Sequence, residues 1–99
     1  MKLYSLKCKS LKLYNVPFTA ADDGAAVAGI CASVQQCKDA PIVQQIIADI
    51  DDFSLFTLGE FDSKNGVKNA RPKLVTELAS VSMLSKIVKE VVEGVQKSV

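Results

Sequence analysis

The 99-residue chain contains no histidine, so its candidate functional residues are its cations and aromatic rings. Without imidazole, a His general base, a Cys–His pair and a His-based zinc site are all excluded. Single-stranded nucleic acid, in contrast, is bound by cations that contact phosphates and by rings on which bases stack. Eight residues in two segments form the candidate nucleic-acid interface: Lys7, Lys9, Lys12, Tyr14, Lys64, Lys68, Arg71 and Lys73.

Tyr14 is the best candidate for base stacking among the aromatic residues, because it lies beside Lys12 and just before a turn at Asn15-Val16-Pro17. The other rings are explained more simply as core, since a chain without tryptophan has few other large side chains to fill its interior. No sequence motif of a nucleic-acid-binding protein accompanies these residues. The prediction therefore depends on residue types and on where the fold places them.

Charge is unevenly distributed along the chain, although the net charge is only +1. Residues 1–19 carry four lysines and no acid, residues 20–62 carry eight acids and one lysine, and residues 63–75 carry four cations and no acid. If the two basic segments meet in the fold, seven cations of the candidate interface share one positive face. The charge pattern alone is explained more simply by a solvated surface that carries both signs.

Carboxylates and thiols predict no further site. The five acids between Asp49 and Asp62 lack the ligand spacing of a calcium loop, and Asp51-Asp52 is better explained as the end of a helix. The three cysteines match neither a redox pair nor a metal site, so we expect free thiols in a reducing compartment. With no nucleophile–base pair, we expect a binding protein that is not an enzyme and has no cofactor, metal or small-molecule substrate.

The composition, 48% hydrophobic and 23% charged, is typical of a globular protein. The length predicts a single domain, with residues 1–75 as an α+β core and residues 76–99 as an amphipathic C-terminal helix. No apolar run approaches the roughly 20 residues that cross a bilayer, and the alternating N-terminus does not resemble a signal peptide. We therefore expect a cytoplasmic protein with no membrane partner.

Hydrophobic periodicity predicts a small antiparallel or mixed β-sheet. Residues 2–9 alternate as in a half-buried strand, whereas residues 53–61 are apolar on both faces, which is typical of a strand that is central or bulged at Gly59. Asn65-Gly66 is a strong hairpin signal before a short strand at 66–70. We expect the 53–61 strand to lie in the centre of the sheet, paired with both of the others.

Three helices are expected, at 23–36, 42–50 and 80–97. The first begins at a cap, Asp22 or Asp23, and its small residues, including Gly29, predict close packing against the sheet. The last is strongly amphipathic, and its apolar stripe must be buried on the second face of the sheet or against a second copy of the chain. In a homo-oligomer, the interface would comprise Leu84, Ile87, Val88, Val91, Val92 and Val95.

Three segments in order give the chain a likeness to a known family. They are Met-Lys-Leu-Tyr-Ser-Leu at residues 1–6, Pro-Phe-Thr-Ala at 17–20 with Asp-Asp-Gly-Ala-Ala-Val-Ala at 22–28, and Asp-Phe-Ser-Leu-Phe-Thr-Leu-Gly-Glu-Phe-Asp at 52–62. Over roughly residues 1–70 the chain resembles the small nonstructural protein of gokushovirus-type microviruses, which are single-stranded DNA phages. It departs from that family in a longer C-terminal extension and in a first helix without basic residues.

The resemblance implies a phage nonstructural protein that binds single-stranded DNA in viral DNA synthesis or packaging, in the cytoplasm of the host cell. The family offers no catalytic motif to carry over. A protein-interaction or assembly factor that acts as an oligomer, without direct DNA binding, is the alternative.

Overall fold

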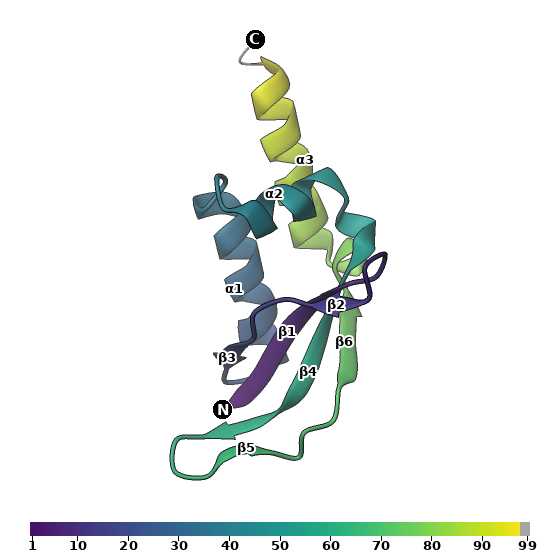
Figure 1. The fold of residues 1–99 in the computed structure, drawn as a ribbon. Coiled ribbons are helices and arrows are strands. Elements are labelled where there is room, and N and C mark those ends of the chain that lie inside the picture. The colour runs from purple at the N-terminus through teal and green to yellow at the C-terminus, as the bar shows by residue number, and fades with distance from the viewer. Residues whose placement is uncertain (98–99) are drawn as a thin grey trace.

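The computed structural model describes the backbone of residues 1–97 and the side chains of residues 1–93 (Figure 1). The fold is α+β, as predicted, with a six-stranded antiparallel sheet and three helices. In chain order the elements are β1 (Lys2–Cys8), β2 (Leu13–Tyr14), β3 (Phe18–Ala20), α1 (Asp23–Gln36), α2 (Pro41–Ala48), the 3-10 turn η1 (Ile50–Asp52), β4 (Phe53–Asp62), β5 (Gly66–Lys68), β6 (Lys73–Glu77), the 3-10 turn η2 (Leu78–Ser80) and α3 (Ser82–Lys97).

The sheet is built around the antiparallel pair β1 and β4, which run side by side from Lys2 opposite Glu60 to Cys8 opposite Phe53. β3 and β2 pair with the outer edge of β1, and β5 and β6 pair with the outer edge of β4. The predicted central position of β4 and its pairing with β1 and β5 are confirmed. Strand β6 was not expected from the sequence, which placed no strand after the 66–70 segment.

A bulge near Gly59 bends β4. Leu3 lies opposite Gly59 and Tyr4 opposite Thr57, so Leu58 is an extra residue on β4. Gly59 has φ +148°, and a Cβ at this position would lie 2.7 Å from the carbonyl oxygen of Lys68. Only glycine therefore suits the bulge, because both the dihedral angle and the approach of the β5–β6 connection exclude a side chain.

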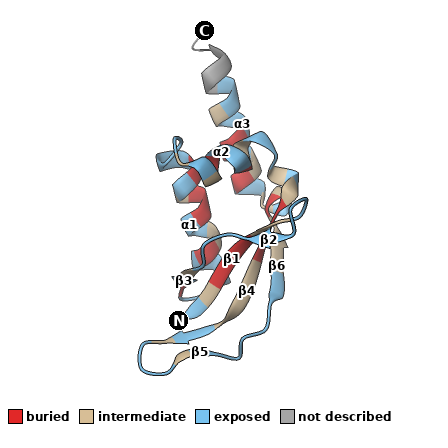
Figure 2. Ribbon diagram, in the orientation of Figure 1, coloured by how far each residue is buried: buried red, intermediate tan, exposed pale blue. Residues whose placement is uncertain are grey.

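The three helices pack on one face of the sheet, and a single core lies between them (Figure 2). Because side chains alternate along a strand, Tyr4, Leu6 and Leu55 face this core and their neighbours in sequence face the other side. Tyr4 is fully buried, and its hydroxyl donates to Asp23 Oδ1 at 2.7 Å. Burial and this hydrogen bond raise the pKa of Tyr4.

α1 begins at Asp23, as predicted, and of the two candidate caps it is Asp22 whose carboxylate accepts from the backbone N–H of Ala25 at 2.8 Å. Close packing does not explain Gly29, because a Cβ there would meet no atom within 4 Å. The second helix ends at Ala48 and residues 50–52 form a separate 3-10 turn, whereas one helix was expected over 42–50. None of the helices in the described part of the chain is long and apolar enough to span a membrane.

The apolar stripe of α3 is partly buried within the chain itself. Leu84, Ile87 and Val88 pack into the core beside α1, on the same face of the sheet, so the expected packing on the second face is wrong. Their burial also requires no second copy of the chain. Farther along α3, Val91 is half-buried and Val92 is exposed, and the side chain of Val95 lies outside the described residues.

Candidate nucleic-acid interface

A cluster of one lysine and two aromatic rings, Lys7, Tyr14 and Phe56, lies on the helix-free face of the sheet. Lys7 is opposite Tyr14 in the β1–β2 pair, and Phe56 is opposite Ser5 in the β1–β4 pair. The rings of Tyr14 and Phe56 meet edge to face with centroids 5.6 Å apart. The Lys7 ammonium lies 5.2 Å from the Tyr14 centroid and 5.6 Å from that of Phe56, within cation–π distance of both.

The small side chain between the two rings is what allows them to meet across β1. Ser5 is fully buried, and its hydroxyl donates to the carbonyl oxygen of Asn15 at 2.7 Å. The backbone N–H of Asn15 donates to Leu6 O at 2.7 Å, so the residue after Tyr14 is fixed to β1 from two directions. Tyr14 is 41% exposed on this support, and one face of the sheet thus presents a held ring to solvent.

The turn between β1 and β2 is held by the carboxylate of Asp52, the last residue of η1 directly before β4. Asp52 accepts hydrogen bonds from the backbone N–H of Ser10 at 2.8 Å, from the Ser10 hydroxyl at 2.6 Å and from the Cys8 thiol at 3.1 Å. The hydrogen bonds from the Ser10 and Cys8 side chains lower the pKa of Asp52. The sequence marked this position as a helix end, but it contained no signal for the long-range contact to Ser10.

The cations of this face differ in how far they are neutralised. Lys9 Nζ forms an ion pair with Glu77 Oε2 at 3.0 Å, and the same oxygen accepts from the Ser54 hydroxyl. The hydrogen bond from the Ser54 hydroxyl has the larger effect in lowering the pKa of Glu77, and the contact with Lys9 lowers this pKa further. Lys7 has no ion pair within 4 Å among the described side chains, and Lys12 is exposed in the turn at φ +56°. Lys7 and Lys12 are therefore the cations best able to meet phosphates here.

The second basic segment lies at the other end of the sheet. Lys7 is opposite Ser54 whereas Lys68 is opposite Glu60, a separation of six residues or about 20 Å along β4. Lys68 also faces the helix side and contacts Asp62 Oδ2 at 3.6 Å. The two basic segments therefore do not form the single positive face that was considered from the sequence.

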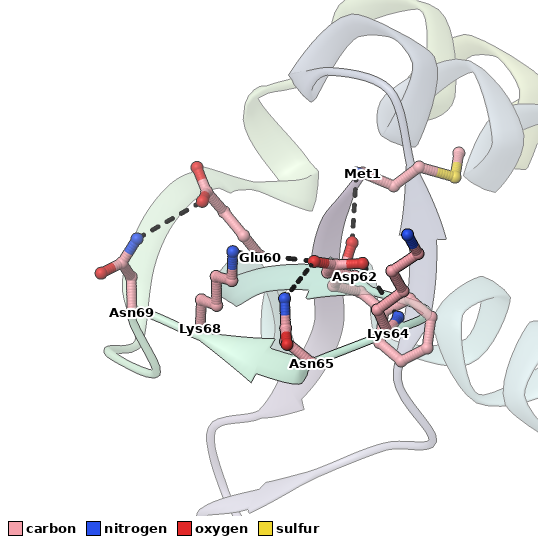
Figure 3. A network of polar contacts seen from close by, with 8 residues as sticks. Met1, Glu60, Asp62, Lys64, Asn65, Lys68 and Asn69 are labelled. Carbon is pink, nitrogen blue, oxygen red and sulfur yellow. Dashed lines mark hydrogen bonds and ion pairs between the residues drawn. The ribbon is translucent and has the colours of Figure 1, made fainter.

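The tip of the β4–β5 hairpin is a polar turn organised by Asp62 (Figure 3). Its carboxylate accepts from the backbone N–H of Lys64 and from the side-chain amide of Asn65, each at 2.9 Å. Both hydrogen bonds lower the pKa of Asp62, and the one from the Lys64 backbone has the larger effect. Lys64 is exposed at this tip, while Arg71 and Lys73 line a polar hollow beside the β5–β6 connection.

A further hollow is an apolar groove of about 650 Å³ between α1, α2 and the segment before β3. Its walls include Val16, Phe18, Ile30 and Ile42, and no charged residue lines it. It therefore offers no positive charge to hold a phosphate. The sequence analysis did not include Phe56 in the candidate interface. Strand alternation along β4 could have placed its ring there, once one face of β4 was known to be free of helices.

These features define a small α+β protein whose helix-free sheet face carries a lysine beside two aromatic rings that contact each other. The chain matches the family described as Phage ORF5 protein over residues 1–81, and it belongs to that phage protein family. The match ends directly before α3, which begins at Ser82. No curated protein and no solved structure matches the chain significantly.

Proposed function

We propose that this phage protein is a non-enzymatic, single-stranded DNA-binding protein that works in viral DNA synthesis or packaging in the host cytoplasm, as its resemblance to the gokushovirus-type protein implies. The observation that carries the proposal is the cluster of Lys7, Tyr14 and Phe56 on the helix-free face of the sheet. Bases stack on exposed rings and phosphates pair with nearby cations, so both elements of single-strand recognition occur together.

In the proposed complex, a base stacks on the exposed face of Tyr14 while its flanking phosphates draw the Lys7 and Lys12 ammonium groups from the protein surface. The edge-to-face contact with Phe56 keeps the Tyr14 ring upright and limits the entropy lost on binding. Recognition by stacking and phosphate contact depends little on sequence, which suits a protein that covers a viral genome.

The proposal is tested by fluorescence anisotropy with a short oligo-dT strand. Tyr14→Ala should weaken binding roughly 5- to 150-fold, since one base stack is worth about 1–3 kcal/mol, whereas Tyr14→Phe keeps the ring and should bind like wild type. With two or three phosphate contacts, a fourfold rise in salt should weaken binding roughly 7- to 18-fold.

Lys7→Gln provides the charge test, with Lys38→Gln as its matched control because Lys38 is exposed in the α1–α2 turn. Weaker binding for the Lys7 variant alone supports the cluster. Equal weakening by both variants, or no salt-sensitive binding by wild type at low ionic strength, contradicts the proposal.

A second candidate function is assembly through self-association, without direct DNA contact. It is favoured by the end of α3, which extends beyond α1 and α2 and carries the exposed Val92 (Figure 1). Of the residues expected in an oligomer interface, Val91 and Val92 remain available for this role, because the three earlier ones already belong to the core.

A further inference from the structure

A polar hollow of about 570 Å³ lies at the end of the sheet farthest from the β1–β2 turn. It is lined by residues from β1, β4, the β5–β6 connection and β6, chiefly Lys2, Thr57, Gly59, Asn69, Arg71 and Lys73. Three of these side chains are cationic, and Glu60 is the one carboxylate in the lining. The hollow therefore carries a net positive charge of two.

The charges of this hollow are not neutralised within the described residues. The described side chains form two ion pairs, Lys9 with Glu77 and Lys68 with Asp62, and neither pair includes a cation of the hollow. Glu60 accepts a hydrogen bond from the Asn69 side-chain amide at 3.3 Å (Figure 3). It forms no ion pair with Lys2, its register partner. Three unpaired cations that share one concavity repel each other, and an anion placed among them relieves that repulsion.

The backbone around the hollow is fixed by the bulge at Gly59. The absence of a side chain there lets the carbonyl oxygens of Lys68 and Asn69 come within 2.7 and 3.2 Å of where a Cβ would lie. Asn69 continues the bend with φ +52°, so the connection crosses close to β4 before β6 begins. This crossing sets Arg71 and Lys73 beside Thr57, which is the register partner of Lys73.

We propose that this hollow is a binding site for a phosphate group, separate from the Lys7–Tyr14–Phe56 cluster. A guanidinium offers two parallel N–H donors to phosphate oxygens, lysines add point charge, and the Thr57 hydroxyl is a further donor. The hollow contains no aromatic residue, so it selects for phosphate and not for a base. The phosphate can come from a free nucleotide or from a DNA backbone, and the two sources are separated by experiment.

The test is a titration of the ¹⁵N-labelled full chain, followed by amide chemical shifts at constant ionic strength. The probes are inorganic phosphate, thymidine 5′-monophosphate and an abasic phosphodiester strand, which has no bases to stack on Tyr14. Amides of Gly59, Asn69 and Lys73 should shift with at least one probe. Shifts with the first two probes identify a free phosphate compound, and shifts with the abasic strand alone identify a DNA backbone.

The double variant Arg71→Gln with Lys73→Gln should weaken probe binding about tenfold or more, because it removes two charge-assisted contacts. The control, Lys38→Gln with Lys89→Gln, loses the same charge at exposed positions outside the hollow and should bind within about twofold of wild type. Absence of shifts with all three probes, identical shifts with chloride, or equal weakening by the control overturns the site. Tyr14→Ala should leave these shifts unchanged, so failure of DNA stacking and failure of the phosphate site are distinguishable.

Discussion

At the scale of single residues, carboxylates in this chain act mainly as internal acceptors. Asp52 joins the β1–β2 turn to the start of β4, and Asp22 and Asp62 hold a helix start and a hairpin tip. Residue types and spacing predicted a cap at Asp22 or Asp23, because capping is a local interaction between residues two or three positions apart. The contact of Asp52 with Ser10 joins positions 42 residues apart, and only the paired strands bring them together.

Asp52→Asn should lower the melting temperature at neutral pH, because the amide offers one acceptor oxygen where the carboxylate offers two to Ser10 and Cys8. Since the pKa of Asp52 is lowered in the folded protein, its stabilising effect is present above the pKa of an unfolded aspartate and is lost as the pH falls below it. Thermal unfolding at pH 7 and pH 3 measures this. The gap between wild type and variant should narrow in acid.

Asp51→Asn is the matched control, because Asp51 is an exposed neighbour and undergoes the same change of charge. If its melting temperature at pH 7 falls as far as that of the Asp52 variant, the effect comes from net charge and the contacts to Ser10 and Cys8 do not matter.

At the scale of elements, the sequence predicted where strands and helices occur better than it predicted which elements pack or pair with each other. The two-sided apolar pattern of residues 53–61 indicated a central strand, and Asn65-Gly66 indicated its hairpin partner, because both signals are local. β6 was missed since Arg71-Pro72 signals a chain break, whereas β6 forms on the free edge of β4. The stripe of α3 required burial, but periodicity does not say which surface covers it, and α1 does so here.

The same limit applied to the candidate site. Tyr14 and Lys7 were chosen by residue type, but the sequence did not show that Phe56 joins them, since the ring could equally fill the core. Strand register decides the matter, because Phe56 faces away from Leu55 and toward Tyr14. The cations of the second basic segment, residues 63–75, were grouped with Lys7 on charge alone. In the structure, the length of β4 separates this segment from Lys7.

Gly59→Ala should destabilise the protein by about 1–3 kcal/mol, because it forces an L-residue to φ +148° and places a Cβ 2.7 Å from a carbonyl oxygen. Gly29→Ala is the matched substitution in an open helical position and should stabilise by up to about 1 kcal/mol. Urea unfolding of both variants measures the difference. Equal stability of the two would show that the bulge tolerates a side chain and that the β5–β6 crossing does not need glycine.

At the scale of the whole molecule, the acidic middle of the chain does not cancel its basic ends. Five acids each accept hydrogen bonds from the protein itself, namely Asp22, Asp23, Asp52, Glu60 and Asp62, so five of the eight acids between residues 20 and 62 have internal partners. The cationic areas lie at opposite ends of the sheet, with the helices on one face between them. In the proposed complex, a DNA strand bound on the helix-free face would meet Lys7 and Lys12 without crossing the helical layer.

The extension of α3 beyond the rest of the fold determines how self-association should be tested. Removal of residues 80–99 would also remove Leu84, Ile87 and Val88 from the core, so a lost oligomer could not be told from a lost fold. Val92→Glu instead changes an exposed position only. If chains associate through the end of α3, light scattering should show a mass above 10.6 kDa for wild type and the monomeric mass for the variant, because a buried unpaired carboxylate is costly.

Gln44→Glu on α2 is the control, since it adds the same charge at an exposed position away from α3. It should keep the wild-type mass, and thermal unfolding should show that both variants remain folded. A monomeric wild type at high protein concentration would contradict the assembly candidate. DNA would then be bound by a monomer, and the Val92→Glu variant should bind oligo-dT with the same affinity as wild type. Reduced DNA affinity of a folded monomeric Val92→Glu protein would instead mean that several copies must act together on one strand, as multivalent binding requires.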